Sequence, residues 1–342
     1  MEFLQDSIPK VYLAAAAAAL YARASSSLLR PGLPRLVALL PVLAFLAAAP
    51  LAFTSSTNVR GTAAFFLAWL GTFKVALLAT GRGPLDPALP VLTFVFTALL
   101  PVKLREGAAP ANKGSKPVSL VSCAAKVAVI AVLLRLYQFS DRMHLYVRLA
   151  LYGVHIYCFF DLLLPCIAAA GGALGMEMEP QFDRPYLASS LRDFWGRRWN
   201  LMVSAILRPS VYDPVRARAG SATGVLASFA VSGLMHEAMV CYLSLRWPPS
   251  GGMAAFFVLH GVCCVAEAWC ARRWATSGWP PLPRPVATAL VGLFVTATSF
   301  WIFFPALLPG VEEKLMEEWA AVGAFFLDAG RKVPSYGQWS KS

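Results

Sequence analysis

The chain is organised around a polar, aromatic stretch that reads Asp193-Phe194-Trp195-Gly196-Arg197-Arg198-Trp199-Asn200. Aromatic rings, two permanent positive charges and a terminal carboxamide come together within this short segment. Farther along, a single histidine, His236, stands in the apolar run Val231-Ser232-Gly233-Leu234-Met235-His236-Glu237. An ionisable side chain inside such a run is costly and is usually functional. A surface suited to anions therefore precedes a candidate buried base.

The composition of the whole chain is that of a membrane protein. Of the 342 residues, 58% are hydrophobic and 14% are charged, and the mean hydropathy is +0.60. A soluble core does not take up so large a share of a chain. The net charge of +12 is compatible with nucleic-acid binding, but the Lys and Arg residues are scattered between apolar runs. Basic loops beside membrane spans explain that pattern better, so no nucleic-acid partner is predicted.

The apolar runs predict an all-α, multi-pass membrane protein with eight to ten crossings, because about twenty apolar residues cross the hydrocarbon layer. The main candidate spans cover residues 36–53, 62–78, 118–137, 145–170, 224–245, 253–270 and 286–308. Residues 11–20 imitate a signal peptide, but acidic Glu2 and Asp6 precede them. We therefore expect a retained first span. Residues 91–102 cross only if residues 87–90 join them.

A single domain over residues 1–342 is expected, with two polar segments. Residues 171–224 are a polar and amphipathic region, and residues 311–342 form a C-terminal tail. Within 187–201, apolar residues recur near helical spacing, which predicts an amphipathic helix lying at the membrane interface. No internal repeat is present. Positive charges occur on both odd-numbered and even-numbered loops, so counting them does not decide which side of the membrane each loop faces.

Charged residues inside the spans are expected to have structural roles. Lys74 is predicted to extend its amine to the interface along an apolar stem. One predicted span carries Lys126 and Arg135, and the next carries Arg148, His155 and Asp161. Opposed charges on neighbouring spans are expected to pair structurally. His155 and His260 are expected to be structural.

Seven cysteines lie mostly within apolar runs and show no C-x-x-C spacing, so free buried thiols are expected. The side chains of His260, Cys263, Cys264 and Glu267 share one helical face, an arrangement that suits a metal ion. A packed apolar face explains the spacing equally well, and no metal site is predicted.

Several motifs together resemble those of plant wax synthases. They are Phe194-Trp195-Gly196-Arg197-Arg198-Trp199-Asn200, Arg208-Pro209, Tyr212-Asp213-Pro214-Val215 and Ser232-Gly233-Leu234-Met235-His236-Glu237. Plant wax synthases are long-chain-alcohol O-fatty-acyltransferases of the membrane-bound O-acyltransferase superfamily. In that superfamily an aromatic motif ending in Trp-Asn precedes an intramembrane His by a few tens of residues, as Asn200 and His236 do here. The resemblance implies an uncleaved enzyme of the endoplasmic reticulum membrane.

The resemblance implies transfer of a fatty acyl group from acyl-CoA, a co-substrate, to a fatty alcohol, with no permanently bound cofactor. His236 is the candidate general base, because imidazole with an unperturbed pKa of about 6.5 accepts a proton near neutrality. The Asn200 amide suits donation to the thioester carbonyl or orientation of the imidazole. A helix cap or an interhelical hydrogen bond is the other reading of Asn200.

Arg197 and Arg198 are candidates for the phosphates of acyl-CoA, since guanidinium groups match phosphate oxygens. Trp195 and Trp199 beside them belong to the same candidate binding surface. Contact with anionic membrane lipids is an equal alternative for the two arginines. Arg208, Arg216 and Arg218 are expected to contact lipid headgroups.

Other functions share some of these sequence features. The resemblance also permits a sterol acyltransferase or a diacylglycerol acetyltransferase, so the acceptor is a fatty alcohol or another lipid alcohol. A transporter would also carry His, Lys and Asp in its spans, but it more often shows matching inverted repeats. His236-Glu237 does not complete an H-E-x-x-H motif, because Val240 stands at the place of the second His.

Overall fold

The computed structural model describes residues 2–105, 120–278, 280 and 282–332. This part of the chain is helical, with one isolated antiparallel bridge between Leu104 and Met178 and no named strand. The long helices are α1 (Ile8–Leu28), α2 (Leu33–Ala48), α6 (Leu120–Leu136), α7 (Leu145–Ala173), α10 (Asp213–Ser244), α11 (Gly252–Thr276), α12 (Arg284–Thr298) and α14 (Glu312–Lys332). The all-α prediction is confirmed.

Shorter helices and π-helical segments complete the spans. The short α-helices are α3 (Thr57–Ala63), α4 (Thr72–Ala79), α5 (Val91–Leu99), α8 (Leu191–Asp193), α9 (Leu201–Leu207) and α13 (Phe304–Leu307). The π-helical segments are η3 (Ala64–Gly71), η6 (Phe194–Arg198), η7 (Arg208–Tyr212) and η8 (Ser299–Phe303). Thus α3, η3 and α4 form one continuous span, and so do α12, η8 and α13.

Seven spans in the described residues are long and apolar enough to cross a membrane. They are Leu33–Ala52, Thr57–Ala79, Val121–Arg142, Leu145–Ala173, Leu201–Ser244, Gly252–Thr276 and Arg284–Leu307. The number is lower than the eight to ten crossings expected. Helices α1 and α5 are not among these spans, and α5 has only nine residues. The chain is a multi-pass membrane protein.

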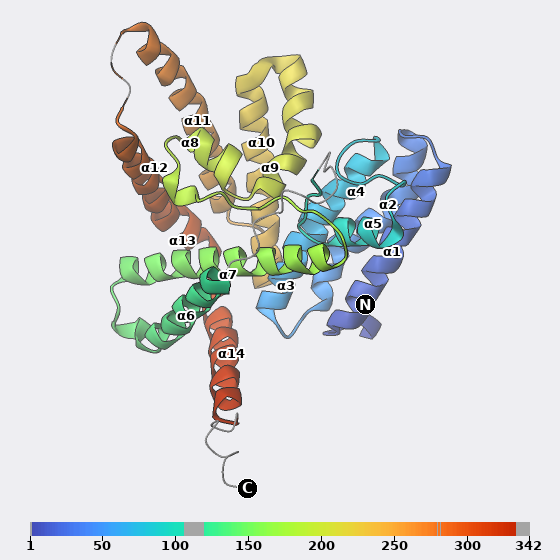
Figure 1. The fold of residues 1–342 in the computed structure, drawn as a ribbon, viewed down its shortest axis with the longest axis horizontal. Coiled ribbons are helices and arrows are strands. Elements are labelled where there is room, and N and C mark those ends of the chain that lie inside the picture. Colours follow the sequence, from blue (N-terminus) through green and yellow to red (C-terminus); the bar gives the residue numbers. More distant parts are fainter. Residues whose placement is uncertain (1, 106–119, 279, 281, 333–342) are drawn as a thin grey trace.

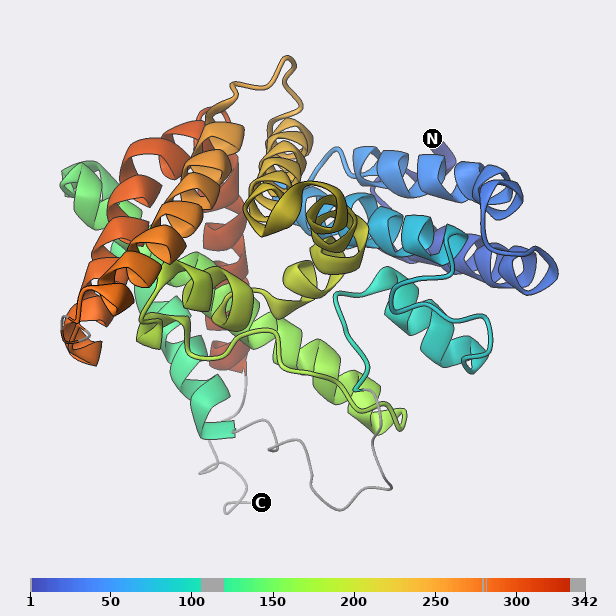
Figure 2. The same ribbon diagram turned by 90° about the horizontal axis from the view of Figure 1, so that it is seen from above.

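The helices form two groups with α10 between them (Figures 1 and 2). The first group contains α1 to α5, and the second contains α11 to α13. Helix α7 runs across one face of both groups, and α14 extends from the lower end in Figure 1. The largest buried cluster lies in the first group, around Leu39, Leu67, Leu70 and Phe94.

Arg60 joins the first group to the end of α10. Its guanidinium donates hydrogen bonds to the carbonyl oxygens of Tyr242 at 2.6 Å, Leu243 at 2.8 Å and Phe53 at 2.8 Å. The last carbonyls of a helix have no partner within it, so Arg60 satisfies two of them at the end of α10. This contact fixes the height of the span Thr57–Ala79 relative to α10.

Helix α10 reverses direction near its beginning. Gly220 has φ +84° and a non-helical backbone, which joins two helical pieces. The second piece returns along η7, where Gly224 lies so close that a Cβ would come within 3.0 Å of the Tyr212 ring. The reversal places residues 216–218 at the upper end of the fold in Figure 1.

Lys74 corrects one sequence prediction. Its side chain does not reach the interface: the residue is fully buried, and Nζ donates to the carbonyl oxygens of Thr97 and Leu100 at 2.6 Å each. Helix α5 ends inside the protein, where its free carbonyls need a donor. The expected pairing of opposed charges on neighbouring spans is found between Lys126 and Asp161, with Nζ 2.9 Å from Oδ2.

Candidate active site

Within 187–201 the main helical piece is α8 continued by η6 over residues 191–198, so the amphipathic helix expected there is shorter than predicted. The break lies at Asn200, whose backbone is left-handed with φ 45° and ψ 65°. Asn tolerates this conformation better than most residues, and its Oδ1 accepts a hydrogen bond from the Val203 amide at 3.4 Å to cap α9. Asn200 is therefore a helix cap, and its carboxamide nitrogen remains a donor.

A cavity of about 850 Å³ brings most of the sequence-predicted site residues together. It lies among η6, α9, α10 and α11. Its lining includes the predicted His236, Asn200, Arg197, Trp195 and Trp199. The sixth predicted residue, Arg198, is not among the residues that line it.

His236 stands at the inner end of the cavity, beside buried aromatic rings. Its Nδ1 lies 2.7 Å from the carbonyl oxygen of Ser232, one turn earlier on α10. A carbonyl oxygen only accepts, so Nδ1 carries the proton and Nε2 keeps its lone pair. The imidazole stacks on Phe257 with ring centroids 4.0 Å apart and meets Trp69 edge-on at 4.8 Å. These rings hold the imidazole in place.

Trp195 is held in the cavity wall by a chain of hydrogen bonds. Its Nε1 donates to Nδ1 of His260 at 3.0 Å. Indole is only a donor, so the neutral His260 ring carries its proton on Nε2 and donates to the Thr298 hydroxyl at 2.9 Å. That hydroxyl in turn donates to the Phe294 carbonyl at 2.8 Å. His260 is thus a buried support behind the wall.

The outer part of the cavity is rich in positive charge. Five exposed arginines line it: Arg192, Arg197, Arg208, Arg216 and Arg272. Asp193 and Glu267 are the carboxylates in the same lining. Exposed arginines at the rim and buried rings at the inner end give the cavity a charged mouth and an apolar interior.

Arg198 has a different environment from its neighbour Arg197. Its side chain is 13% exposed, and Nε lies 2.7 Å from Oδ2 of Asp193. Burial by itself raises the pKa of the Asp193 carboxyl, but hydrogen bonds from Arg198 and the Ser189 amide, with the charges of both arginines, outweigh that effect. The pKa of Asp193 is therefore held below its ordinary value, and the ion pair folds the stretch back on itself.

The face of α11 that carries His260 and Glu267 makes contacts within the protein. The Glu267 carboxylate accepts hydrogen bonds from the Leu191 amide at 2.9 Å and the Arg192 amide at 3.2 Å, which caps α8. Among the described residues, no three His, Cys, Asp or Glu side chains gather in a group that would hold a metal ion. His155 lies elsewhere, with Nδ1 3.1 Å from the Tyr137 hydroxyl.

Sequence reasoning missed Trp69, Arg192 and Arg272 as cavity residues. Trp69 belongs to the first helix group, far from the motif in sequence, and an aromatic residue in an apolar run carries no signal of its own. Arg192 lies in α8 and Arg272 lies in the last part of α11, where they resemble ordinary basic residues near a span.

Comparison with known proteins covers nearly the whole chain. The model of the "Membrane bound O-acyl transferase family" matches residues 178–259. The chain is 40% identical over 330 residues to a long-chain-alcohol O-fatty-acyltransferase of Simmondsia chinensis, covering 91% of this chain and 92% of the relative. It is 39% identical over 332 residues to a probable long-chain-alcohol O-fatty-acyltransferase 1 of Arabidopsis thaliana, covering 93% and 96%.

A third relative is the acyl-CoA–sterol O-acyltransferase 1 of Arabidopsis thaliana, which is 35% identical over 329 residues and is covered to 93%. The matched segment 178–259 contains both the aromatic stretch and His236. The chain therefore belongs to the plant wax synthase family of the membrane-bound O-acyltransferase superfamily.

Proposed function

We propose that this protein is an acyl-CoA:long-chain-alcohol O-acyltransferase that makes wax esters in the endoplasmic reticulum membrane. The observation that carries the proposal is the position of His236 at the apolar end of a cavity whose mouth is lined by arginines. Two of its similar relatives are named long-chain-alcohol O-fatty-acyltransferases. A cavity of this form suits a substrate with a polyanionic head and a long apolar tail.

In this proposal His236 acts as the general base. Nε2 takes the proton of the alcohol hydroxyl while the alcohol oxygen attacks the thioester carbonyl carbon. The Asn200 carboxamide donates to the carbonyl oxygen, where negative charge develops. The carbon–sulfur bond then breaks, and the departing coenzyme A thiolate takes the proton back from His236.

Arg197 and the other rim arginines are the proposed contacts of the coenzyme A phosphates. Each guanidinium is permanently charged and can donate two parallel hydrogen bonds to a phosphate. Trp195 and Trp199 form the wall beside them. Arg198, which is paired with Asp193, has a positioning role in this scheme. Acyl-CoA is a co-substrate here, and the alcohol and the surrounding lipid are the remaining partners.

The acceptor is tested directly with microsomes from a host that lacks the activity. The membranes are supplied with labelled acyl-CoA and, in separate reactions, a fatty alcohol, a sterol or diacylglycerol. Wax ester from the fatty alcohol is expected as the main product. If steryl ester were the main product, the proposed activity would instead be that of an acyl-CoA–sterol O-acyltransferase, the activity named for the third relative. No ester from any acceptor, with expression confirmed, would contradict an acyltransferase.

The role of the base is tested with His236→Ala. Ester formation is expected to fall by more than about a hundredfold, while the protein still accumulates in membranes. His155→Ala is the control for loss of an imidazole outside the cavity and is expected to keep its turnover per folded molecule. His260→Ala is expected to lower thermal stability more than turnover, because it removes the support of Trp195. Near-normal turnover by purified His236→Ala would exclude the mechanism.

A further inference from the structure

A second polar side chain, that of Trp69, lies beside His236 in the lining of the cavity. Trp69 is 3% exposed and lines the cavity, and its ring centroid lies 4.8 Å from that of His236. Its indole Nε1 is buried, and among the residues that the structure describes it has no hydrogen-bond partner. Buried donors without a partner are rare in native proteins and cost free energy, which indicates that a ligand supplies the acceptor.

The backbone at Trp69 supports a functional role. Trp69 belongs to η3, a π-helical segment inside the span Thr57–Ala79. Such segments appear frequently at functional sites. The Arg60 contacts with α10 fix the height of this span, and Phe65 packs edge-on against Trp69 with ring centroids 5.5 Å apart. The indole is therefore held in place before a substrate binds.

Three other neutral donors of the lining are already engaged. The Ser204 hydroxyl donates to the Trp195 carbonyl at 3.0 Å, and the Ser228 hydroxyl donates to the Gly224 carbonyl at 2.9 Å. The Trp195 indole donates to His260. The Trp69 N–H, in contrast, has no hydrogen-bond partner among the described residues, and its ring lies against the imidazole.

We propose that Trp69 is a further catalytic residue, whose Nε1–H donates a hydrogen bond to the carbonyl oxygen of the acyl thioester. The inference rests on the proposed function. When the alcohol oxygen adds to the carbonyl carbon, its proton passes to Nε2 of His236 and the carbonyl electrons move to the oxygen that Trp69 holds. The C=O bond re-forms as the carbon–sulfur bond breaks. Trp69 and Asn200 thus stabilise the same developing charge.

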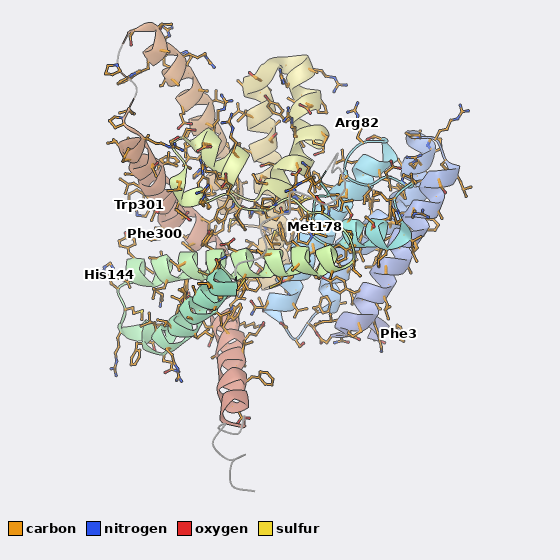
Figure 3. The ribbon with its side chains drawn as sticks, in the orientation of Figure 1. Phe3, Arg82, His144, Met178, Phe300 and Trp301 are labelled. Atoms are coloured by element: carbon orange, nitrogen blue, oxygen red, sulfur yellow. The ribbon has the colours of Figure 1, made fainter. Side chains whose placement is uncertain are left out.

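The test is Trp69→Phe, which keeps an aromatic ring against His236 and removes the N–H. Loss of one such donor is expected to lower kcat by about a hundredfold or more, with KM for acyl-CoA and alcohol changed by less than about threefold. The control is Trp301→Phe, on an exposed side chain at the outer edge of the second group (Figure 3). It is expected to match the wild type.

Folding and binding are measured on the same samples. The melting temperature in detergent and the affinity for a non-transferable acyl-CoA analogue are measured for each variant. Loss of the hydrogen-bond donor alone leaves both unchanged, whereas loss of packing lowers them. Unchanged kcat in Trp69→Phe would overturn the proposal, and so would parallel losses of stability, analogue binding and turnover, which indicate a packing role. Failure of the wild-type protein to form any ester is a distinct result, because it contradicts the proposed function itself.

Discussion

Two neighbouring arginines with the same charge occupy different environments. Arg197 is exposed and lines the cavity, whereas the Arg198 side chain is largely buried and hydrogen-bonded to Asp193. Arg198 also donates from Nη1 to the Asp183 carbonyl at 3.1 Å. A charge that already has a carboxylate partner and a carbonyl is poorly suited to bind a phosphate. The difference between the two residues is therefore expected to appear in kinetics.

Arg197→Ala is expected to raise KM for acyl-CoA by about tenfold, which corresponds to about 1.4 kcal/mol for one charge-assisted hydrogen bond. KM for the alcohol should change little, because the alcohol has no phosphate. Arg198→Ala is the matched comparison: it leaves Asp193 unpaired and should lower the melting temperature with a smaller effect on KM. Steady-state kinetics and thermal melts on both variants check this. Equal KM effects on both substrates would favour a lipid-contact role for Arg197.

At the scale of elements, a single carboxylate docks α14 against α3. Glu318 on α14 accepts hydrogen bonds from the Ser56 hydroxyl at 2.8 Å, the Asn58 amide at 3.0 Å and the Asn58 side-chain nitrogen at 2.8 Å. Negative charge is favourable at a helix N-terminus, where amides lack partners. Burial raises the pKa of Glu318, but these hydrogen bonds outweigh burial and hold the pKa below its ordinary value.

Glu318→Gln is expected to lower the stability of the folded protein by about 1 kcal/mol at pH 7, because it removes the negative charge at the α3 N-terminus. The wild-type contribution is fully present above the unfolded Glu pKa, about 4.3, and is lost as pH falls through the lower folded pKa. The difference in melting temperature between wild type and variant at pH 7 should therefore shrink as the pH falls below about 4.3 and vanish once the pH lies below the folded pKa of Glu318. The neighbour Glu317→Gln is the control. A difference in melting temperature between wild type and Glu318→Gln that persists in acid would argue against this contact.

Across the whole molecule, basic and acidic connections lie at opposite ends. The α1–α2 connection, Arg82 after α4, the segment 216–218 and the end of α11 lie at the upper end, and each of them carries arginine (Figures 1 and 3). The lower end includes the chain near Phe3 and the acidic start of α14. Basic connections favour the cytoplasmic side, so the mouth of the cavity is expected to face the cytoplasm.

The orientation is tested by mass-tagging single added cysteines with an impermeant maleimide on intact microsomes. Arg218→Cys is expected to react without permeabilisation, and Lys314→Cys only after it. The parent protein, which has seven native cysteines, provides the background. If only Lys314→Cys reacted in sealed vesicles, the orientation would be the opposite of the one expected. The arginine-lined mouth would then face away from cytoplasmic acyl-CoA.

The sequence by itself determined the membrane class, the approximate position of the main spans and the motif of the site. Hydropathy and helical periodicity are local properties, so they can be computed without knowing what packs where. The same locality explains one error. The destination of Lys74 depends on where α5, a separate helix, ends inside the protein.

Only the tertiary structure decided which residues meet at the cavity. Trp69 reaches His236 because Arg60 fixes one span against α10, and Arg198 leaves the site because Asp193 binds it. The first outcome depends on packing between segments far apart in the chain, and the second on how the stretch 193–198 folds back on itself. A linear pattern identifies a group able to do chemistry, but the free energy of burying and partnering that group depends on segments far away in the chain.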